Sequence, residues 1–189
     1  MAYQTAQPTV RYNRRSTDRS KAAVVFYKTR MEAEIAVHLL KRCGTWAGEL
    51  SVIGRESGGK AGIVGFRSDG RLIRGQRPMG DCWSRIMSTL QSSACFLVPG
   101  MGAVIAAGPV VQWTADALEI AEMGNRPGRL GDGLFSIGVP RSGAEEFEEK
   151  LESGHCAVII HGTVDRVDRA AGMLELTDHQ SMMAHECAV

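Results

Sequence analysis

The stretch AAVVFY (22–27), followed by TRME (29–32) and ELSVIG (49–54), decides the fold of this chain. AAVVFY is an uninterrupted apolar run, which predicts a buried strand. The first and last residues of TRME have the spacing of a capping box, in which each side chain binds a free amide of the first helical turn. Gly44 is a natural helix end, and ELSVIG predicts a second strand. Together these segments predict a β-α-β unit.

The helix between these two strands has a predicted apolar face made by Met31, Ile35, His38 and Leu39. On this interpretation His38 is a core histidine whose polar atoms are satisfied. It is therefore not expected to be a catalytic base.

A similar pattern recurs near the end of the chain. Ser142 and Glu145 have the spacing of a second capping box, and CAVIIHG (156–162) predicts a strand. A last helix is predicted from a face that holds Val164, Val167, Ala171 and Leu174. We therefore expect an α+β fold, specifically a ferredoxin-like α/β sandwich with duplicated strand–helix–strand units and an elaborated middle that contains β-hairpins.

The middle of the chain begins with a predicted hairpin and a helix. AGIVGF and RLIRG, in the segment 61–75, flank Ser68-Asp69-Gly70, and Asp-Gly is a strong turn signal. The helix that follows has one apolar face, which is expected to pack inward and consists of Trp83, Ile86, Met87 and Leu90.

Residues 86–115 include no charged side chain, which raises the question of a membrane span. Several polar residues interrupt this run, and Pro99-Gly100-Met101-Gly102 breaks it in the middle. The apolar pieces ACFLV (94–98) and AVIAA (103–107) are each of strand length. We therefore expect a β-hairpin that turns at Pro99–Gly102 rather than a membrane-spanning helix.

The first 21 residues differ from the rest of the chain in charge. Of a total net charge of +1, residues 1–21 carry +4 and the remainder −3. We expect an extended basic arm that binds a partner through Arg11, Arg14, Arg15 and Arg19, with a solvated tail as the alternative. The 189 residues are thus divided into this arm (1–21), a single α+β domain (22–177) and a C-terminal tail (178–189).

The five cysteines are scattered, odd in number and without a CxxC pair, which predicts reduced and mostly buried thiols. The N-terminal segment has no apolar core of signal-peptide length. These two features lead us to expect a cytoplasmic protein.

No sequence motif for catalysis or for a cofactor is complete. The segment from Gly54 to Ala61 has the spacing of a phosphate-binding P-loop, but Ala61 stands where the motif needs Ser or Thr. No G-x-S-x-G motif occurs. We therefore expect neither enzymatic activity nor a bound cofactor.

The histidines provide the candidate metal ligands. His179, His185 and Cys187 lie in the predicted tail, and imidazole and thiolate are soft-metal ligands, but their spacing matches no known metal motif. His155 and His161 are six residues apart, which would place them on the same face of a strand. We expect these two to serve packing and hydrogen bonding.

Several short motifs occur in an order that resembles a bacterial family. They are PGMG (99–102), GP (108–109), FSIGVP (135–140) and HGT (161–163), with Phe66 to Gly70 and Trp83 in matching places. Over about residues 22–177 the chain is similar to the general-stress-protein-like family of unknown function, whose members are often described as membrane proteins. The resemblance implies an α+β fold and a stress role, and it implies no catalytic residues.

This chain departs from the family pattern in two segments that are usually apolar there. The helix around Trp83 holds Asp81 and Arg85, and the segment 119–129 holds four charged residues. Both differences weaken the membrane interpretation for this protein.

We therefore expect a non-catalytic interaction or assembly protein that acts through protein–protein contacts including its basic arm, and the resemblance implies a stress role for it. Its partner is expected to be a second copy or a larger protein assembly. It is not expected to be nucleic acid, because a net charge of +1 creates no strong field. Two alternatives remain, namely a metal- or small-ligand-binding sensor and a peripheral membrane stress protein.

Overall fold

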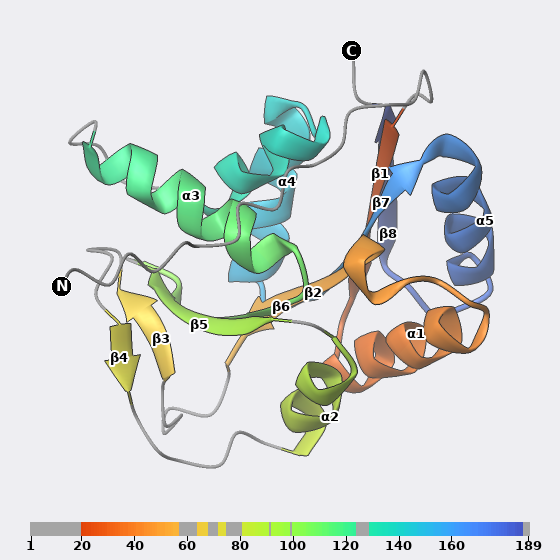
Figure 1. Cartoon of the computed structure of the whole chain (residues 1–189), viewed down its shortest axis with the longest axis horizontal. Helices are drawn as coiled ribbons and strands as arrows, with labels where there is room; N and C mark the ends of the chain where they lie inside the picture. The colour runs from red at the N-terminus through yellow and green to blue at the C-terminus, as the bar shows by residue number, and fades with distance from the viewer. Residues whose placement is uncertain are drawn as a thin grey trace, which may run out of the picture.

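A sheet of eight strands runs through the molecule in the order β4-β3-β5-β6-β2-β7-β1-β8 (Figure 1). The structure is a computed structural model that describes residues 20–56, 64–67, 72–74, 81–90, 92–98, 100–123 and 129–186. In chain order the elements are β1 (Ser20–Tyr27), α1 (Arg30–Arg42), η1 (Ala47–Glu49), β2 (Leu50–Arg55), β3 (Val64–Arg67), β4 (Leu72–Arg74), α2 (Asp81–Thr89), β5 (Ser93–Val98), β6 (Gly102–Ala107), α3 (Val110–Met123), η2 (Leu130–Ile137), α4 (Arg141–Glu152), β7 (Cys156–Thr163), α5 (Val164–Leu174) and β8 (Ser181–Glu186).

The six strands β5-β6-β2-β7-β1-β8 form an antiparallel sheet. β3 extends it as a parallel neighbour of β5, and β4 lies antiparallel to β3 at the edge. α1 connects β1 to β2, and β7 lies between these two strands in the sheet. α5 connects β7 to β8, and β1 lies between those two strands. The predicted α+β class is confirmed.

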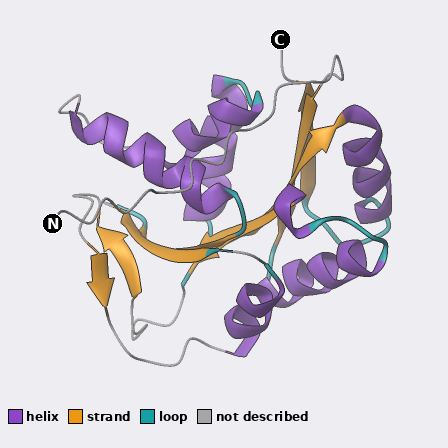
Figure 2. Cartoon of the chain, viewed as in Figure 1, coloured by secondary structure: helices purple, strands orange, loops and turns teal. Residues whose placement is uncertain are grey.

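Helices cover both faces of the sheet (Figure 2). Side chains of α1, α2 and α5 share one core with the sheet, and those of α3, η2 and α4 share the other. In β1, Ala23, Val25 and Tyr27 enter the first core, while Ala22, Val24 and Phe26 enter the second. A strand buried on both faces needs apolar residues at every position, which explains why AAVVFY shows no alternation.

The apolar face predicted for α1 is wrong. The buried residues of this helix are Ala33, Glu34, Ala36, Val37 and Leu40, a stripe at the i, i+3, i+4, i+7 spacing. Met31 and Ile35 are instead 65% and 59% exposed. His38 is also exposed rather than a core residue. Ala33, Ala36, Val37 and Leu40 belong to the core that α1 shares with the sheet, so this stripe is the face that turns inward.

The two predicted capping boxes have different outcomes. Thr29 is the N-cap of α1, and both of its reciprocal bonds with Glu32 are present, so the first box is confirmed. The second is wrong, because α4 begins at Arg141, with Pro140 at the N-cap and no side-chain capping bond. Ser142 therefore lies inside the helix, where its hydroxyl is past the capping position.

The middle of the chain follows the sequence prediction. β5 and β6 pair antiparallel from Ser93↔Ala107 to Val98↔Gly102, which confirms the hairpin at Pro99–Gly102. Gly100 and Gly102 have positive φ angles of 81° and 86°, a backbone conformation that favours glycine. β3 and β4 pair antiparallel on either side of Ser68-Asp69-Gly70, which itself lies outside the described residues.

The inward face predicted for α2 is confirmed. Trp83 and Ile86 are fully buried, Leu90 is 6% exposed, and Met87 packs against the same core. Among the residues that the structure describes, no helix has both the length and the apolar character needed to cross a membrane.

The two ends of the chain differ from the predicted arm and tail. Residues 1–19, with Arg11, Arg14, Arg15 and Arg19, lie outside the described residues. Ser20 and Lys21 begin β1 and pair with Thr163 and Gly162 of β7, so the domain starts two residues earlier than predicted. The segment 178–189 contains β8, which pairs with β1 from Phe26↔Ser181 to Lys21↔Glu186. It is a strand rather than a tail because Met182 and Met183 each pack against one of the two cores.

Candidate functional site

Three cysteines contribute to the environment around α2, and their thiols are difficult to ionise. Cys95 and Cys156 are buried, and Cys82 is half-buried. Burial raises the pKa of the Cys95 thiol to about 11 and that of Cys156 to about 12, and burial together with Glu34 raises the pKa of Cys82 to about 11. Because the thiolate is the nucleophile and the metal ligand, these raised pKa values disfavour nucleophilic or metal-binding roles at neutral pH. The prediction of buried thiols holds for Cys95 and Cys156, whereas Cys82 is half-buried and Cys43 is exposed.

Glu34 of α1 is a buried acid that the sequence pattern does not single out. Arg85 of α2 donates to it from Nε and from Nη2, with an Nη2–Oε2 distance of 2.8 Å. His38 Nε2 lies 3.7 Å from Glu34 Oε1. The hydrogen bonds from Arg85 lower the pKa of Glu34 to about 2, against the opposing effect of burial. A carboxylate held this firmly is a structural ion and not a general base poised near neutral pH.

A signal for Glu34 is present in the sequence. It is a charged residue between Ala33 and Ala36, inside the stripe that faces the core. A buried charge requires a partner, but the partner is 51 residues away in the chain and no local pattern identifies it.

His161 of β7 packs against Trp113 of α3. The two rings meet edge to face, with their centroids 4.7 Å apart and their planes at 88°. His161 Nδ1 is buried and has no hydrogen-bond partner within the described part of the chain. Burial lowers the pKa of His161, and the backbone and the charge of Glu49 oppose this shift. His161 is therefore a packing residue, held neutral near pH 7.

The expected pairing of His155 with His161 on one strand face is wrong. β7 begins at Cys156, so His155 precedes the strand. Its ring Nδ1 lies 3.2 Å from the carbonyl oxygen of Lys150 at the end of α4, which places it in the turn after that helix.

A shallow depression of about 100 Å³ lies beside η1 and α5. Its polar lining includes Glu49 and Arg166, which bind each other, together with Cys43, Thr45, His161 and Arg169. Pockets for small ligands have volumes of about 300–1,000 Å³. The depression therefore has room for a few water molecules rather than for a metabolite.

The predicted metal ligands are not brought together in the described residues. His179 Nδ1 lies 3.1 Å from the carbonyl oxygen of Thr177, and His185 belongs to β8. Cys187 lies outside the described residues. Within those residues no three His, Cys, Asp or Glu side chains form a group that could hold a metal ion.

Gly54, the first residue of the P-loop-like segment, has a packing role. A Cβ at this position would lie 2.6 Å from Cys156 Sγ and 3.3 Å from the indole of Trp83. Glycine is therefore needed for the close approach of these side chains to β2. Residues 57–61 of the segment lie outside the described residues.

The exposed face of α4 is acidic, and only part of it is neutralised. Arg129 contacts Glu148 at 2.6 Å and Glu145 at 3.9 Å, and Arg141 contacts Glu145 at 3.3 Å. The remaining carboxylates of the helix are those of Glu146, Glu149 and Glu152. All three are exposed, and none has a side-chain partner among the described residues. We call these three residues the acidic stripe, because their i, i+3, i+6 spacing places them along one side of the helix.

Comparisons with protein-family models, with curated proteins and with solved structures find no match for this chain. The sites described above therefore stand on their own geometry.

Proposed function

We propose that this chain is a non-catalytic interaction protein that works within a homo-oligomer or a larger protein assembly. Its basic N-terminal segment contacts an acidic protein surface through Arg11, Arg14, Arg15 and Arg19. The stress role implied by the family resemblance and a cytoplasmic location belong to the same proposal.

The acidic stripe on α4 is the observation that carries this proposal. Arg129 and Arg141 engage Glu145 and Glu148 but leave Glu146, Glu149 and Glu152 exposed. The stripe has the opposite sign to residues 1–19, whose net charge is +3. We infer that the N-terminal segment of one copy docks on the stripe of another. Each exposed ion pair contributes only about 0–1 kcal/mol, so several must act together.

The chemistry of the described side chains supports a non-catalytic role. The thiols of Cys82, Cys95 and Cys156 have pKa values raised to about 11 or 12. Glu34 is ionised and hydrogen-bonded to Arg85, and His161 is packed on Trp113. Each of these groups has a structural task that accounts for its position.

We also infer that β8-β1-β7-β2, with α1 and α5, forms a ferredoxin-like unit. Supporting this inference, the chain order β1-α1-β2 then β7-α5-β8 interleaves in the sheet so that β1 and β7 are central. Both helices contribute to the same core. The elements from β3 to α4 are then an insertion between β2 and β7, which is the elaborated middle of the sequence prediction.

The proposal is tested by light scattering on the full chain and on variants. Deleting residues 1–19, which spares the two residues that begin β1, is expected to reduce the molar mass in solution. The charge reversal Glu146→Lys/Glu149→Lys should have the same effect. The matched control is Asp116→Lys/Glu119→Lys, which reverses two exposed charges at the same spacing on α3. Assembly should also weaken between 0.1 M and 1 M salt, as the Debye length falls from about 10 Å to about 3 Å.

The proposal fails if the deletion and the Glu146→Lys/Glu149→Lys reversal both leave the molar mass and its salt dependence unchanged. An equal loss of assembly in the α3 control would contradict the docking site on α4, because it would show a response to net charge alone.

A further inference from the structure

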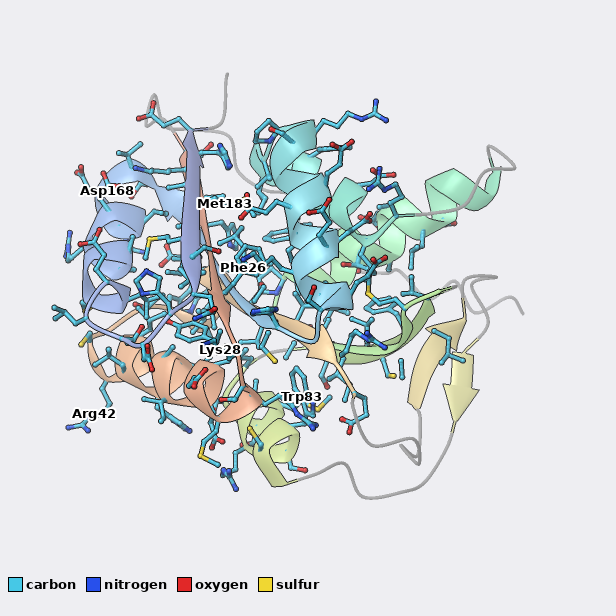
Figure 3. All side chains as sticks on the ribbon, turned by 180° about the vertical axis from the view of Figure 1, so that it is seen from behind. Phe26, Lys28, Arg42, Trp83, Asp168 and Met183 are labelled. Carbon is cyan, nitrogen blue, oxygen red and sulfur yellow. The ribbon has the colours of Figure 1, made fainter. Side chains whose placement is uncertain are left out.

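Two soft metal donors of β8, Met183 and His185, lie on the side of the strand that faces α4. Met183 packs against the core that also holds Phe147 of α4, and His185 follows it by two residues. Side chains two residues apart in a strand point to the same side. Figure 3 shows β8 nearest the viewer, with Met183 labelled on it and with α5 on one side and α4 on the other. Both donors therefore lie between β8 and α4.

The donor atoms of these two side chains converge at Gly143, in the first turn of α4. His185 Nε2 and Met183 Sδ each lie 3.2 Å from the point that a Cβ at Gly143 would occupy. The two atoms are therefore separated by at most twice that distance. Any other residue at position 143 would fill this point, so the lack of a side chain at Gly143 keeps it unfilled.

His185 Nε2 is the atom here that most needs a partner. It is buried and has no hydrogen-bond partner among the residues that the structure describes. A buried polar atom without a partner costs free energy, and the thioether of Met183 is only a weak acceptor. In a neutral ring with its proton on Nδ1, Nε2 has a free lone pair, and the neutral imidazole is the form of histidine that binds metals. A metal ion at this point would satisfy the nitrogen and the sulfur together.

The pair of donors selects the kind of metal. Thioether and thiolate ligands are soft and favour Cu(I), and imidazole also suits copper. Zinc sites in proteins are instead built from thiolate, imidazole and carboxylate ligands, and calcium and magnesium sites are built from oxygen ligands. A methionine in the donor set therefore indicates Cu(I).

We propose that Met183 Sδ and His185 Nε2 bind a Cu(I) ion, with the thiolate of Cys187 as its third ligand. Cys187 lies outside the described residues, and the pattern Met-x-His-x-Cys (183–187) continues the alternation of β8 by one step. The thiol releases its proton to solvent when it binds the metal. The site is distinct from the acidic stripe and goes beyond the proposed function, on which it does not rest.

The position of the site at the N-terminus of α4 favours this third ligand. α4 begins at Arg141, and no side chain caps its first turn. The positive end of a helix dipole disfavours a cation and favours an anion. Cu(I) with one thiolate has no net charge, whereas Cu(I) held by Met183 and His185 alone would keep its positive charge beside this helix end.

Competition for Cu(I) with a coloured chelator, under anaerobic reducing conditions, measures the affinity of the full-length chain. The background carries Cys43→Ser, which removes the exposed thiol. Met183→Leu, His185→Gln and Cys187→Ser should each weaken Cu(I) binding about 100-fold or more, since the loss of an outer-shell partner alone costs about 10–100-fold.

Two matched controls should leave the affinity for Cu(I) unchanged. Met182→Leu removes a thioether from the opposite side of the same strand, because Met182 packs against the core beneath α5. His179→Gln removes a histidine that precedes β8 and lies against the carbonyl oxygen of Thr177. Circular dichroism checks that every variant is folded.

Two further measurements leave all three ligands in place. X-ray absorption at the copper edge, recorded on the background chain, should show both nitrogen and sulfur neighbours. Gly143→Ala adds a Cβ at 3.2 Å from both donor atoms and should weaken Cu(I) binding. The control Gly172→Ala adds a Cβ with no atom within 4 Å and should not.

Each outcome supports or overturns the site. Weaker binding in the three ligand variants, with both controls unchanged, supports it. Unchanged binding in Met183→Leu or His185→Gln, or copper with sulfur neighbours alone, overturns it. Unchanged binding in Cys187→Ser overturns the third ligand. A chain without measurable affinity for Cu(I) overturns the inference and leaves the proposed function standing, whereas a chain that does not assemble leaves the copper site standing.

Discussion

Arg85 of α2 holds the carboxylate of Glu34 in α1 with two hydrogen bonds, and the Nη2–Oε2 distance is 2.8 Å. Glu34 is almost fully buried, whereas about half of the Arg85 side chain is exposed. The contact joins two helices that are separated in the chain by 38 residues and by the three strands β2, β3 and β4. It therefore fixes where α2 docks.

Arg85→Ala should destabilise the protein by about 1–3 kcal/mol, because it leaves a buried carboxylate without its main partner. Glu34 has a folded-state pKa of about 2, lowered from 4.5, so its contribution is present above about pH 4.5 and is lost as the pH falls toward 2. Urea unfolding at several pH values measures this. Glu34→Gln should lose that part of the pH dependence, and an unchanged acid limb would contradict the assignment to Glu34.

Trp83→Ala should cost about 3–5 kcal/mol, the range for truncating a large buried aromatic side chain. Trp83 is fully buried and lies against Gly54 and the core beneath α1. The free energy of unfolding, followed by circular dichroism, is the measurement. Trp46→Ala is the matched control, since Trp46 is 63% exposed, and it should change stability by less than about 0.5 kcal/mol. Similar costs at both positions would show that α2 does not dock as described.

The sequence predicts best those elements that local chemistry determines. The Thr29 capping box, the hairpin at Pro99–Gly102 and the inward face of α2 each depend on residues a few positions apart, and all three are confirmed. β8 was missed because SMMAHE has no clear periodicity, and its conformation depends on pairing with a strand about 160 residues earlier in the chain.

The face of α1 was predicted wrongly for a related reason. Met31 and Ile35 are the larger apolar side chains, but Ala33 and Ala36 belong to the core that α1 shares with the sheet. The helical spacing of Met31, Ile35, His38 and Leu39 did not decide which face turns inward, because packing of a helix on a sheet selects shape as well as hydrophobicity. The Glu34–Arg85 contact was missed because only the tertiary fold brings its two residues together.

His161→Phe should make the protein less sensitive to mild acid. Burial lowers the pKa of His161 below its usual value of 6.5, so the unfolded chain binds a proton more readily than the folded one. Stability should therefore fall as the pH drops through about 6.5 in the wild-type protein. Phenylalanine keeps an aromatic edge against Trp113 and has no proton to bind. The comparison is the difference in melting temperature between pH 7.5 and 5.5, and an equal drop in both proteins would assign the effect to other histidines.

Gly54→Ala should destabilise the protein by about 1–3 kcal/mol, the usual cost of overpacking a core. The added Cβ would lie 2.6 Å from Cys156 Sγ, closer than packed atoms approach, and both residues are held in paired strands. Cys156→Ala removes that sulfur and creates the space that the new methyl group needs. The double variant should therefore lose less free energy of unfolding than the two single variants lose together. A double-mutant cycle should give a coupling energy of about 0.5–3 kcal/mol. Cys95→Ala is the matched control, because it removes another buried sulfur that is not among the three atoms nearest to a Cβ at Gly54. If Gly54→Ala combines additively with Cys156→Ala, the clash with Cys156 is not the reason for glycine at this position.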